Sequence, residues 1–495
     1  MPTKTKTSSK TPVPEMTAAA VSEPAVEESL PTRLSASIDV AHTTDDNYRQ
    51  WQYADGLSAD AAYSPQVRDI LRRRARYEFI NNSICKGIVR TFVNDVVGRG
   101  PLLQMKTGNK RKDQKIEKAW KHWVRAVHLP RKLRTKFLSR IVSGEGLGLL
   151  AQNPRVMHPV QLDLQLIECD RLQNPYNFQG AWDPSSIIDG IDFDFFGNPV
   201  QYMILNQHPG NLVGLDLSAT AYPSQYVLHN YSHTRPEQHR GIPDITQALP
   251  LFADLRRYTA AVIAAAETAA DFSAVMESQN MPETGPVKVA AMDLVPIEKR
   301  MMTTLPQGWK VSQLKAEQPT NVYAAFKREI VAETCRCLNI PYVAGAADAS
   351  GHNFSSAKLD WTGYNVTIDV ERQEIEEELD RILFMFIQDL RFVDGFRDVP
   401  QIYDHEWLWT NRPSSDPRDA GANQTKLQSM QTTFAEFWAG KGKDWVDVVD
   451  EIAEEIAYMK KKGLTPEQIM QVINVERMAE GTPELDDEEE DLNEE

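Results

Sequence analysis

Two groups of residues in this sequence are of types that bind metal ions. Cys335 and Cys337 are separated by one residue, whereas paired thiolates in zinc sites are separated by about two to four. This pair lies in an apolar helical segment, which favours buried thiols in a core. Three histidines are close in the sequence, but no cysteine or carboxylate completes a recognisable ligand set: His229, His233 and His239. We therefore expect no metal site and no cofactor.

Glycines and carboxylates raise two further possibilities, phosphate binding and a magnesium-dependent nuclease. Gly144, Gly146 and Gly148 form G-x-G-x-G without the strand, helix and acidic residue of a dinucleotide site, so they predict a turn entering a strand. Asp192 and Asp194 alternate in a predicted strand, and glutamates occupy residues 376–378. Such carboxylates are more often solvated than bound to metal. The sequence contains no nucleophile-elbow, P-loop, zinc-protease or kinase signature, so we expect no enzyme.

Composition limits the class of protein further. The chain has 495 residues, enough for two or three domain-sized units, and its formal net charge is -16. An acidic chain is poorly suited to coating nucleic acid, because that binding depends on neutralising phosphates with Lys and Arg. No paired framework joins the cysteines, which suits a reducing compartment: Cys85, Cys169, Cys335 and Cys337. The sequence shows no apolar secretory region and no run long enough to span a membrane.

Residues 322–390 predict a helix, a polar loop and a long helix. The first helix has apolar positions at helical spacing, among them Phe326 and Ile330, and ends at Pro341. Small and polar residues follow, and the second helix opens near Ser355. Its apolar positions fall on one face: Ile375, Leu379, Ile382, Leu383, Phe386 and Leu390.

The remaining elements follow from periodicity and turn signals. A basic amphipathic helical segment precedes Gly98, and its buried candidates are Ile70, Ala75, Phe79, Ile84, Ile88, Phe92 and Val96. Alternating apolar residues predict a mostly antiparallel sheet over 144–231. A further helix is predicted over about 245–276, followed by short strands at 287–292 and 309–314.

Residues 106–140 are strongly basic, with Asp113 and Glu117 as the only acidic side chains. One interpretation is a surface that contacts DNA or an acidic partner, and the other is a solvated face balanced by carboxylates elsewhere in the fold. Both remain open from the sequence. The candidate contact residues are Lys110, Arg111, Lys112, Lys115, Arg131, Lys132 and Arg134.

The loop and its flanking residues resemble a motif of the lambda-like portal family of tailed bacteriophages. The matching positions are Ile340, Pro341, Asn353, Phe354, Ser355, Ser356 and Ala357. Weaker similarities, such as Arg240, Gly241 and Pro243 before a long helix, occur in the family's order over residues 47–477. The resemblance implies an α+β portal fold with an α/β wing, a two-helix stem with a small clip insertion, a long wing helix and an α-helical crown, in a ring-forming homo-oligomer.

The resemblance and the composition together divide the chain into nine segments. These are a disordered N-terminal arm (1–46), the wing (47–244), a stem helix (245–280), the clip (281–318), a second stem helix (319–341), the tunnel loop (342–356), the long wing helix and its return (357–412), the crown (413–480) and an acidic disordered tail (481–495).

The resemblance also implies a structural function without bond chemistry. Such a subunit forms a ring, twelve-fold in the family, at one capsid vertex of the virion, and double-stranded DNA passes through the ring during packaging and ejection. Its other partners would be the terminase large subunit, which hydrolyses ATP, head-completion and connector proteins, and the major capsid and scaffolding proteins. The chain would be made in the host bacterial cytoplasm and would not contact a membrane.

We expect four tunnel-loop residues to line the constriction of this channel: Asp348, Ser350, His352 and Asn353. Without the family match, the same loop would be interpreted as an ordinary surface connection between helices. The alternative function is a DNA-binding protein acting through residues 106–140. Oligomeric state separates the two, because a portal forms a large ring without DNA.

Overall fold

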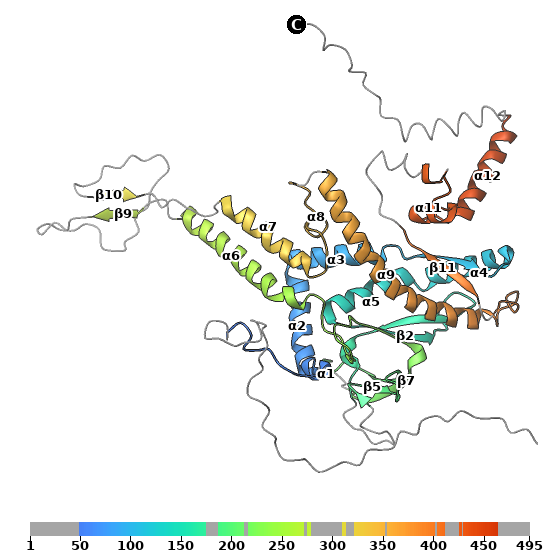
Figure 1. Ribbon diagram of the computed structural model, residues 1–495, viewed down its shortest axis with the longest axis horizontal. Helices are drawn as coiled ribbons and strands as arrows, with labels where there is room; N and C mark the ends of the chain where they lie inside the picture. Colours follow the sequence, from blue (N-terminus) through green and yellow to red (C-terminus); the bar gives the residue numbers. More distant parts are fainter. Residues whose placement is uncertain are drawn as a thin grey trace, which may run out of the picture. The chain divides into compact units, whose positions relative to one another are not determined.

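The computed structural model describes residues 49–174, 187–211, 216–271, 275–278, 309–312, 321–351, 354–400, 403–410, 425–427 and 429–463. Two units are distinguished, Met1–Leu57 and Ser58–Glu495. In the first, a turn closes where Ala54 N donates to Trp51 O at 2.9 Å. The second contains every element named below (Figure 1). The predicted arm (1–46), the strand at 287–292 and the tail (481–495) lie outside the described residues.

The predicted helical segment before Gly98 consists of two helices after a short first one. After the short α1 (Ala59–Ala62), α2 (Pro65–Asn81) and α3 (Ser83–Val97) are separated by Asn82. The Asn82 side chain accepts from Ile84 N and Cys85 N, and so it caps α3. The prediction that Ile70 is buried is wrong, since its exposure is 48%. The face of α2 toward the body instead buries Arg68 and Arg72, whose charges are paired inside the fold.

Two further helices come from the basic segment. α4 (Lys110–Ala126) follows strand β1 (Leu102–Lys106), and α5 (Leu129–Ser143) follows α4. Trp123 of α4 is fully buried and donates from Nε1 to Leu162 O at 2.8 Å. α5 ends at Gly144, whose φ of 89° and backbone contacts leave no room for a side chain. The G-x-G-x-G pattern is therefore a turn into a strand, as predicted.

The predicted antiparallel sheet is confirmed and is divided in two. β2 (Gly146–Gln152) lies between β3 (Leu162–Ile167) and β8 (Val227–Asn230). A second sheet has the order β4-β5-β6-β7, and all its pairs are antiparallel. Its strands are β4 (Ile187–Ile188), β5 (Ile191–Phe193), β6 (Pro199–Leu205) and β7 (Ala219–Pro223).

The next helix ends earlier than predicted. α6 (Leu249–Asp271) is followed by β9 (Val275–Ser278), so the helix predicted to reach residue 276 stops before a strand. β9 pairs antiparallel with β10 (Trp309–Ser312), which confirms a strand at the start of the predicted 309–314. The β-branched and large residues of these two strands favour extended backbone over the alanine-rich helix before them. α7 (Asn321–Arg336) then packs beside α6 (Figure 1).

The C-terminal half of the described chain returns to the body. α8 (Tyr342–Gly345) and α9 (Phe354–Leu390) precede β11 (Asp404–Leu408), and β11 pairs antiparallel with β1. Two helices, α11 (Phe434–Gly440) and α12 (Trp445–Lys461), follow. None of the helices in the described part of the chain combines the length and apolarity that a membrane span requires.

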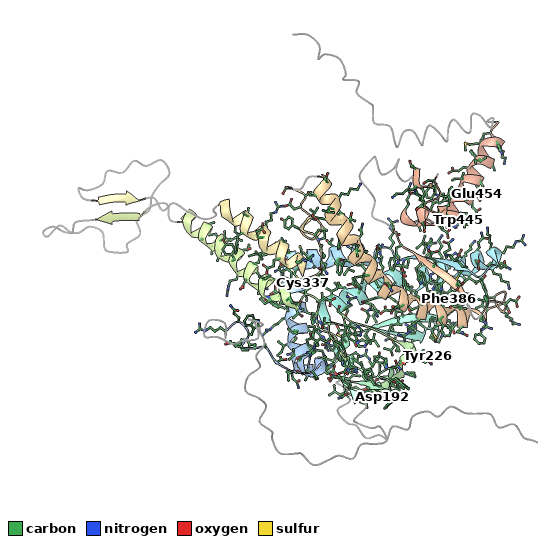
Figure 2. All side chains as sticks on the ribbon, in the orientation of Figure 1. Asp192, Tyr226, Cys337, Phe386, Trp445 and Glu454 are labelled. Atoms are coloured by element: carbon green, nitrogen blue, oxygen red, sulfur yellow. The ribbon has the colours of Figure 1, made fainter. Side chains whose placement is uncertain are left out.

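The main core joins α2, α3, α4, α5, α6, α7 and α9. Phe386 of α9 packs against Trp120 and Trp123 of α4, with ring centroids 5.1 and 5.2 Å apart, and lies among the crowded side chains of this core (Figure 2). A smaller cluster fills the space between the two sheets and includes Leu147, Ile191 and Tyr202. The six apolar positions predicted for one face of α9 are all buried. The core therefore holds α9 against helices distant in the sequence.

Candidate functional site

The loop predicted to be functional joins α8 to α9. Asp348 Oδ1 accepts a hydrogen bond from Ser350 N at 2.9 Å, and Asp348 Oδ2 accepts one from Tyr342 Oη at 3.2 Å. The hydrogen bonds from Ser350 lower the pKa of Asp348 below its ordinary value. Ser350 is exposed and Asp348 is partly exposed. His352 and Asn353, the other two predicted channel residues, lie outside the described part.

The loop is shorter than the predicted 342–356, because its first residues form α8. This turn packs closely on α7, and an added Cβ at Gly345 would lie 2.3 Å from Cys335 Sγ. Cys335 is fully buried, and burial raises the pKa of its thiol to about 12. The prediction of buried core thiols is therefore confirmed for Cys335. Cys337 is only partly buried, with its Sγ 3.1 Å from Asp244 O.

Arg328 of α7 contacts both α8 and the far end of the described loop. Its guanidinium lies over the Tyr342 ring, with Cζ 4.8 Å from the ring centroid. It also approaches Gly351, where an added Cβ would lie 3.1 Å from Arg328 Nη1. Gly351 has a φ of 91°, which a residue with a side chain rarely adopts. The loop is thus positioned by one arginine and one glycine.

The family motif straddles this loop. Ile340 is 3% exposed and belongs to the core, and Pro341 precedes the first turn of α8. Phe354 is the first residue of α9, and Ser355 and Ser356 are exposed in its first turn. The motif therefore marks where α8 begins and where α9 begins.

The first half of α9 is only partly covered by the body. Tyr364 is buried and donates from Oη to Asp95 Oδ2 at 3.0 Å. Three large apolar side chains point away from that contact, with exposures of 74% for Leu359, 63% for Val366 and 57% for Val370. Because they are spaced by seven and four residues, they form one line along the helix. We call Leu359, Val366 and Val370 the apolar line of α9.

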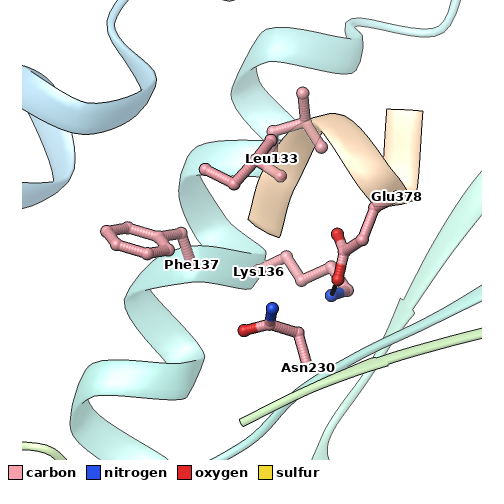
Figure 3. Close-up of a pocket in the computed structure, with 6 residues that line it drawn as sticks. Leu133, Lys136, Phe137, Asn230 and Glu378 are labelled. Carbon is pink, nitrogen blue, oxygen red and sulfur yellow. Dashed lines mark hydrogen bonds and ion pairs between the residues drawn. The ribbon is translucent and has the colours of Figure 1, made fainter. Parts of the chain in front are cut away.

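The second half of α9 is held to α5 by ion pairs. Arg140 of α5 lies 2.6 Å from a Glu371 oxygen and 2.9 Å from a Glu374 oxygen. One helical turn away, Lys136 Nζ lies 2.5 Å from Glu378 Oε1, beside Asn230 (Figure 3). Lys136 is 3% exposed, so this contact is a buried ion pair. These pairs fix α9 along α5 in one register.

Other residues of α9 bind the strand β11 and the end of α3. Trp407 Nε1 donates to Asp380 Oδ1 at 2.7 Å, and Trp409 Nε1 donates to Glu376 Oε1 at 2.5 Å. Arg372 donates to Val96 O at 3.0 Å. Two glutamates of the run at 376–378, Glu376 and Glu378, are therefore structural partners rather than solvated side chains.

A cluster of charged side chains is buried where α2, β2 and β8 meet. Glu145 is fully buried, and Arg240 Nε donates to it at 2.6 Å while Arg72 Nη2 lies 3.3 Å away. Burial would raise the pKa of Glu145, but the charge and hydrogen bonds of Arg240 outweigh it, and the pKa lies well below the ordinary value. Sequence reasoning noted Arg240 in an R-G-x-P motif but had no signal that Glu145 was its partner.

The three histidines that suggested a metal site do not converge. His229 is buried beside Glu145, with Nε2 3.6 Å from Oε1. His239 Nδ1 lies 2.6 Å from Asp60 Oδ2, and His233 stacks on Tyr231 with centroids 4.2 Å apart. His229 also lies against the Tyr231 ring, with centroids 4.9 Å apart, so two of the histidines flank one tyrosine and the third pairs with Asp60.

One group of metal-ligating types does occur within the described ranges, formed by Glu168, Asp170 and His208, whose ligand atoms lie within 4.8 Å of one another. Asp170 is already paired with Arg76 at 2.5 Å and with Arg72 at 3.4 Å. Two arginines at this carboxylate disfavour a further cation by charge repulsion. We interpret the group as an ionic contact between η2 (Cys169–Arg171) and α2.

The predicted basic patch is divided between two environments. Lys132 pairs with Asp163, Arg134 donates to Gly98 O, and Lys112 donates to Asp398 O at 3.3 Å. The other four residues are exposed, three on α4 and one on α5: Lys110, Arg111, Lys115 and Arg131. Much of α5 therefore fits the interpretation in which basic side chains are balanced by groups elsewhere in the fold. The basic side chains of α4 fit the other interpretation, an exposed basic surface.

Comparison with known proteins identifies the class of this molecule as a phage portal protein. The sequence matches the family described as phage portal protein, lambda family, over residues 44–372. This match covers more than half of the 495 residues, and the chain belongs to the lambda family of phage portal proteins.

Individual relatives are more distant. The "Probable portal protein" of Halomonas phage phiHAP-1 is 22% identical over 429 residues, which cover 80% of this chain and 82% of the relative. Among solved structures, a chain in the neck of a native gene transfer agent particle is 13% identical, with a TM-score of 0.42, 75% of this chain covered and 90% of that chain. A chain of the native gene transfer agent virion is 12% identical, with a TM-score of 0.44, 76% of this chain covered and 93% of that chain.

Proposed function

We propose that this portal protein assembles into a ring of twelve copies at one capsid vertex of a virion, through which double-stranded DNA is packaged and ejected. Family membership supports the portal role. One structural observation supports self-assembly: the apolar line of α9 is exposed in the single chain. Large apolar side chains in a contiguous line lose water contact when another surface covers them, at about 25 cal/mol per Å². A neighbouring copy in the ring provides that surface.

The segments take the roles that the resemblance implies. α6 and α7 form the stem, with β9 and β10 between them in the clip that docks the terminase large subunit and the connector proteins. The helices α2 to α5 and both sheets form the wing together with α9, and α11 and α12 belong to a crown that faces the capsid interior. Contacts with major capsid and scaffolding proteins would complete the vertex.

The channel acts without making or breaking bonds. Moving DNA requires a wall that does not retain phosphates, because each neutralised phosphate releases counterions and strengthens binding. The described loop suits this requirement, since Asp348 is ionised at neutral pH and Ser350 is an uncharged exposed residue. His352 and Asn353 would extend the same surface into the channel. ATP hydrolysis belongs to the terminase motor in this scheme.

The test is the mass and shape of the purified protein. We expect electron microscopy to show rings with a central channel, and light scattering to give a mass near twelve times 56.0 kDa. Val366→Asp places a charge in the apolar line and should reduce the ring fraction at least tenfold at a fixed concentration. Asn365→Asp adds the same charge on an adjacent exposed position outside the line and serves as the matched control.

Two results would contradict the proposal. A native chain that stays monomeric with scaffolding protein present has no ring state. A Val366→Asp variant that assembles as well as Asn365→Asp shows that the apolar line is not covered in the ring.

A further inference from the structure

One face of α4 carries basic side chains and no acidic ones, in a protein of net charge -16. Helical spacing places the exposed residues of α4 on a continuous strip about 140° wide. We call this strip the basic face of α4, and its basic members are Lys110, Arg111, Lys115, Lys118, His122 and Arg125. The two acidic residues of the helix point the other way: Asp113 is buried, and Glu117 accepts a hydrogen bond from Met105 N at 2.7 Å.

The basic face differs from the neighbouring basic helix α5 in its lack of partners. Lys132, Lys136 and Arg140 of α5 each pair with a carboxylate. For Lys110, Lys115 and Lys118, the described ranges contain no carboxylate within salt-bridge distance. Concentrating cations on one strip costs repulsion energy, which an acidic occupant would relieve.

Helix α12 begins close to this strip. Lys121, at the edge of the basic face, pairs with Asp447 in the first turn of α12. Asp444 and Trp445 line a small pocket together with Glu117 of α4. The beginning of α12 is thus held against α4 by an ion pair and by packing.

We propose that the basic face of α4 binds the acidic segment 484–495 of the same chain. Nine of these twelve residues are Asp or Glu, and the basic face offers five Lys or Arg side chains and one histidine as their counterpart. About 20 residues separate the last described residue from this segment. That length spans about 30 Å as a helix and at most about 70 Å extended, and α4 itself is about 25 Å long.

Double-stranded DNA is the competing occupant, and two arguments favour the acidic segment. The segment is tethered, so its effective concentration at α4 is of the order of millimolar without any free ligand. The protein's net charge of -16 repels a phosphate backbone at long range, whereas a segment of the same chain is already present. Binding of the segment therefore shields the basic face from DNA and from other acidic partners until something displaces it.

The experiment uses the full chain with the acids of residues 484–495 changed to Asn and Gln, which frees the basic face. The probe is a fluorescein-labelled peptide with the native sequence of residues 484–495, and binding is measured by anisotropy at low salt. Adding Lys110→Gln, Lys115→Gln and Lys118→Gln should weaken peptide binding by about tenfold or more, because each lost cation removes one attraction. Neutralising three exposed cations on α2 and α3 is the matched control: Arg74→Gln, Lys86→Gln and Arg90→Gln.

Two further measurements separate the acidic segment from DNA. The native chain should bind the labelled peptide several-fold more weakly than the neutralised chain, because its own segment competes. A labelled 20-base-pair duplex should bind the neutralised chain more tightly than the native chain. These readouts need no ring or packaging activity, so their failure is distinct from failure of the portal proposal.

Three results would overturn the inference. If the peptide does not bind the neutralised chain, the acidic segment is not a ligand of the basic face. Equal loss of peptide affinity in the α4 and control variants places the binding elsewhere. If the duplex binds the native and the neutralised chain equally, and the α4 substitutions weaken that binding, DNA is the occupant of the basic face.

Discussion

Arg240 holds both carboxylate oxygens of Glu145, from Nε at 2.6 Å and from Nη2 at 2.8 Å, in a site where their side chains are 2% and 0% exposed. Gly241 N adds a third donor to Glu145 Oε1 at 3.0 Å. Such a bidentate pair fixes the chain before α6 against the turn that enters β2. Arg240 also donates to Asp189 O, between β4 and β5, and to Leu172 O, whose residue bridges to Ile204 of β6, so it links the second sheet to that turn.

Removing Arg240 should destabilise the fold strongly. Arg240→Gln leaves the buried Glu145 charge largely uncompensated, and we expect a loss of about 3 to 5 kcal/mol in the free energy of unfolding. Denaturant unfolding monitored by tryptophan fluorescence measures this loss in the free energy of unfolding. Adding Glu145→Gln should restore part of the stability, because the double variant buries no unpaired charge. The exposed pair of Asp69 and Arg73 is the control, and Arg73→Gln should change stability by less than about 0.5 kcal/mol. A small effect of Arg240→Gln would contradict this account.

Glu117 should make stability fall as the pH rises from mildly acidic to neutral. Burial raises the pKa of Glu117 to about 7 in the folded chain, above its ordinary 4.5. The folded state therefore binds a proton between these values that the unfolded state releases, and ionisation at higher pH costs stability.

Glu117→Gln should consequently be more stable than the native chain above pH 7, by roughly 1 to 2 kcal/mol. The amide oxygen of Gln can still accept from Met105 N. Urea midpoints at pH 5 and pH 8 provide the measurement, and Glu451→Gln on the exposed face of α12 is the control. If the two substitutions behave alike at pH 8, the buried position of Glu117 is not the cause.

A side chain at Gly345 should disrupt the contact between α7 and α8. The Cβ of Gly345→Ala would lie 2.3 Å from Cys335 Sγ, and we expect a loss of about 1 to 3 kcal/mol. Cys335→Ala removes that sulfur, so the double variant should be more stable than Gly345→Ala alone. The measurement is the thermal unfolding midpoint of the native chain, the two single variants and the double variant. Additive losses in the double variant would mean that the two residues do not clash.

Positive charge in the loop should impede DNA movement without preventing assembly. Asp348→Lys adds a cation that attracts phosphate where the proposed channel is narrowest, and we expect the packaged DNA per particle to fall several-fold. Ala349→Lys tests whether charge at an adjacent exposed position has the same effect. Ring mass measured by light scattering should be unchanged in both. Normal packaging by both variants would place the loop away from the DNA.

Periodicity in the sequence was sufficient to predict secondary structure and burial wherever a residue's environment is set by its own helix or strand. The buried face of α9 and the antiparallel strands β2, β3 and β6 were predicted, because alternation and helical spacing report directly which side is apolar. The family motif likewise identified the loop and the start of α9. The end of α6 was predicted too late, since an alanine-rich helix and the strand after it differ little in local apolarity.

Burial of charge was decided by tertiary structure alone. In α2 the apolar Ile70 was predicted to be buried, yet it is exposed while Arg68 and Arg72 are buried. A guanidinium can leave water only where carboxylates replace the hydration, and here these come from Asp189, Glu145 and Asp170, which are far away in the sequence.

The sequence alone indicated the family, the antiparallel strands of the body and a polar loop before the long helix α9. Tertiary structure decided which cations are paired and which are open. α5 runs along α9 and meets its glutamates, whereas the basic face of α4 meets none within the described residues. Tertiary structure also joined β1 to β11, two strands nearly 300 residues apart. Local propensity is a property of neighbouring residues, but pairing energy depends on groups that only folding brings together.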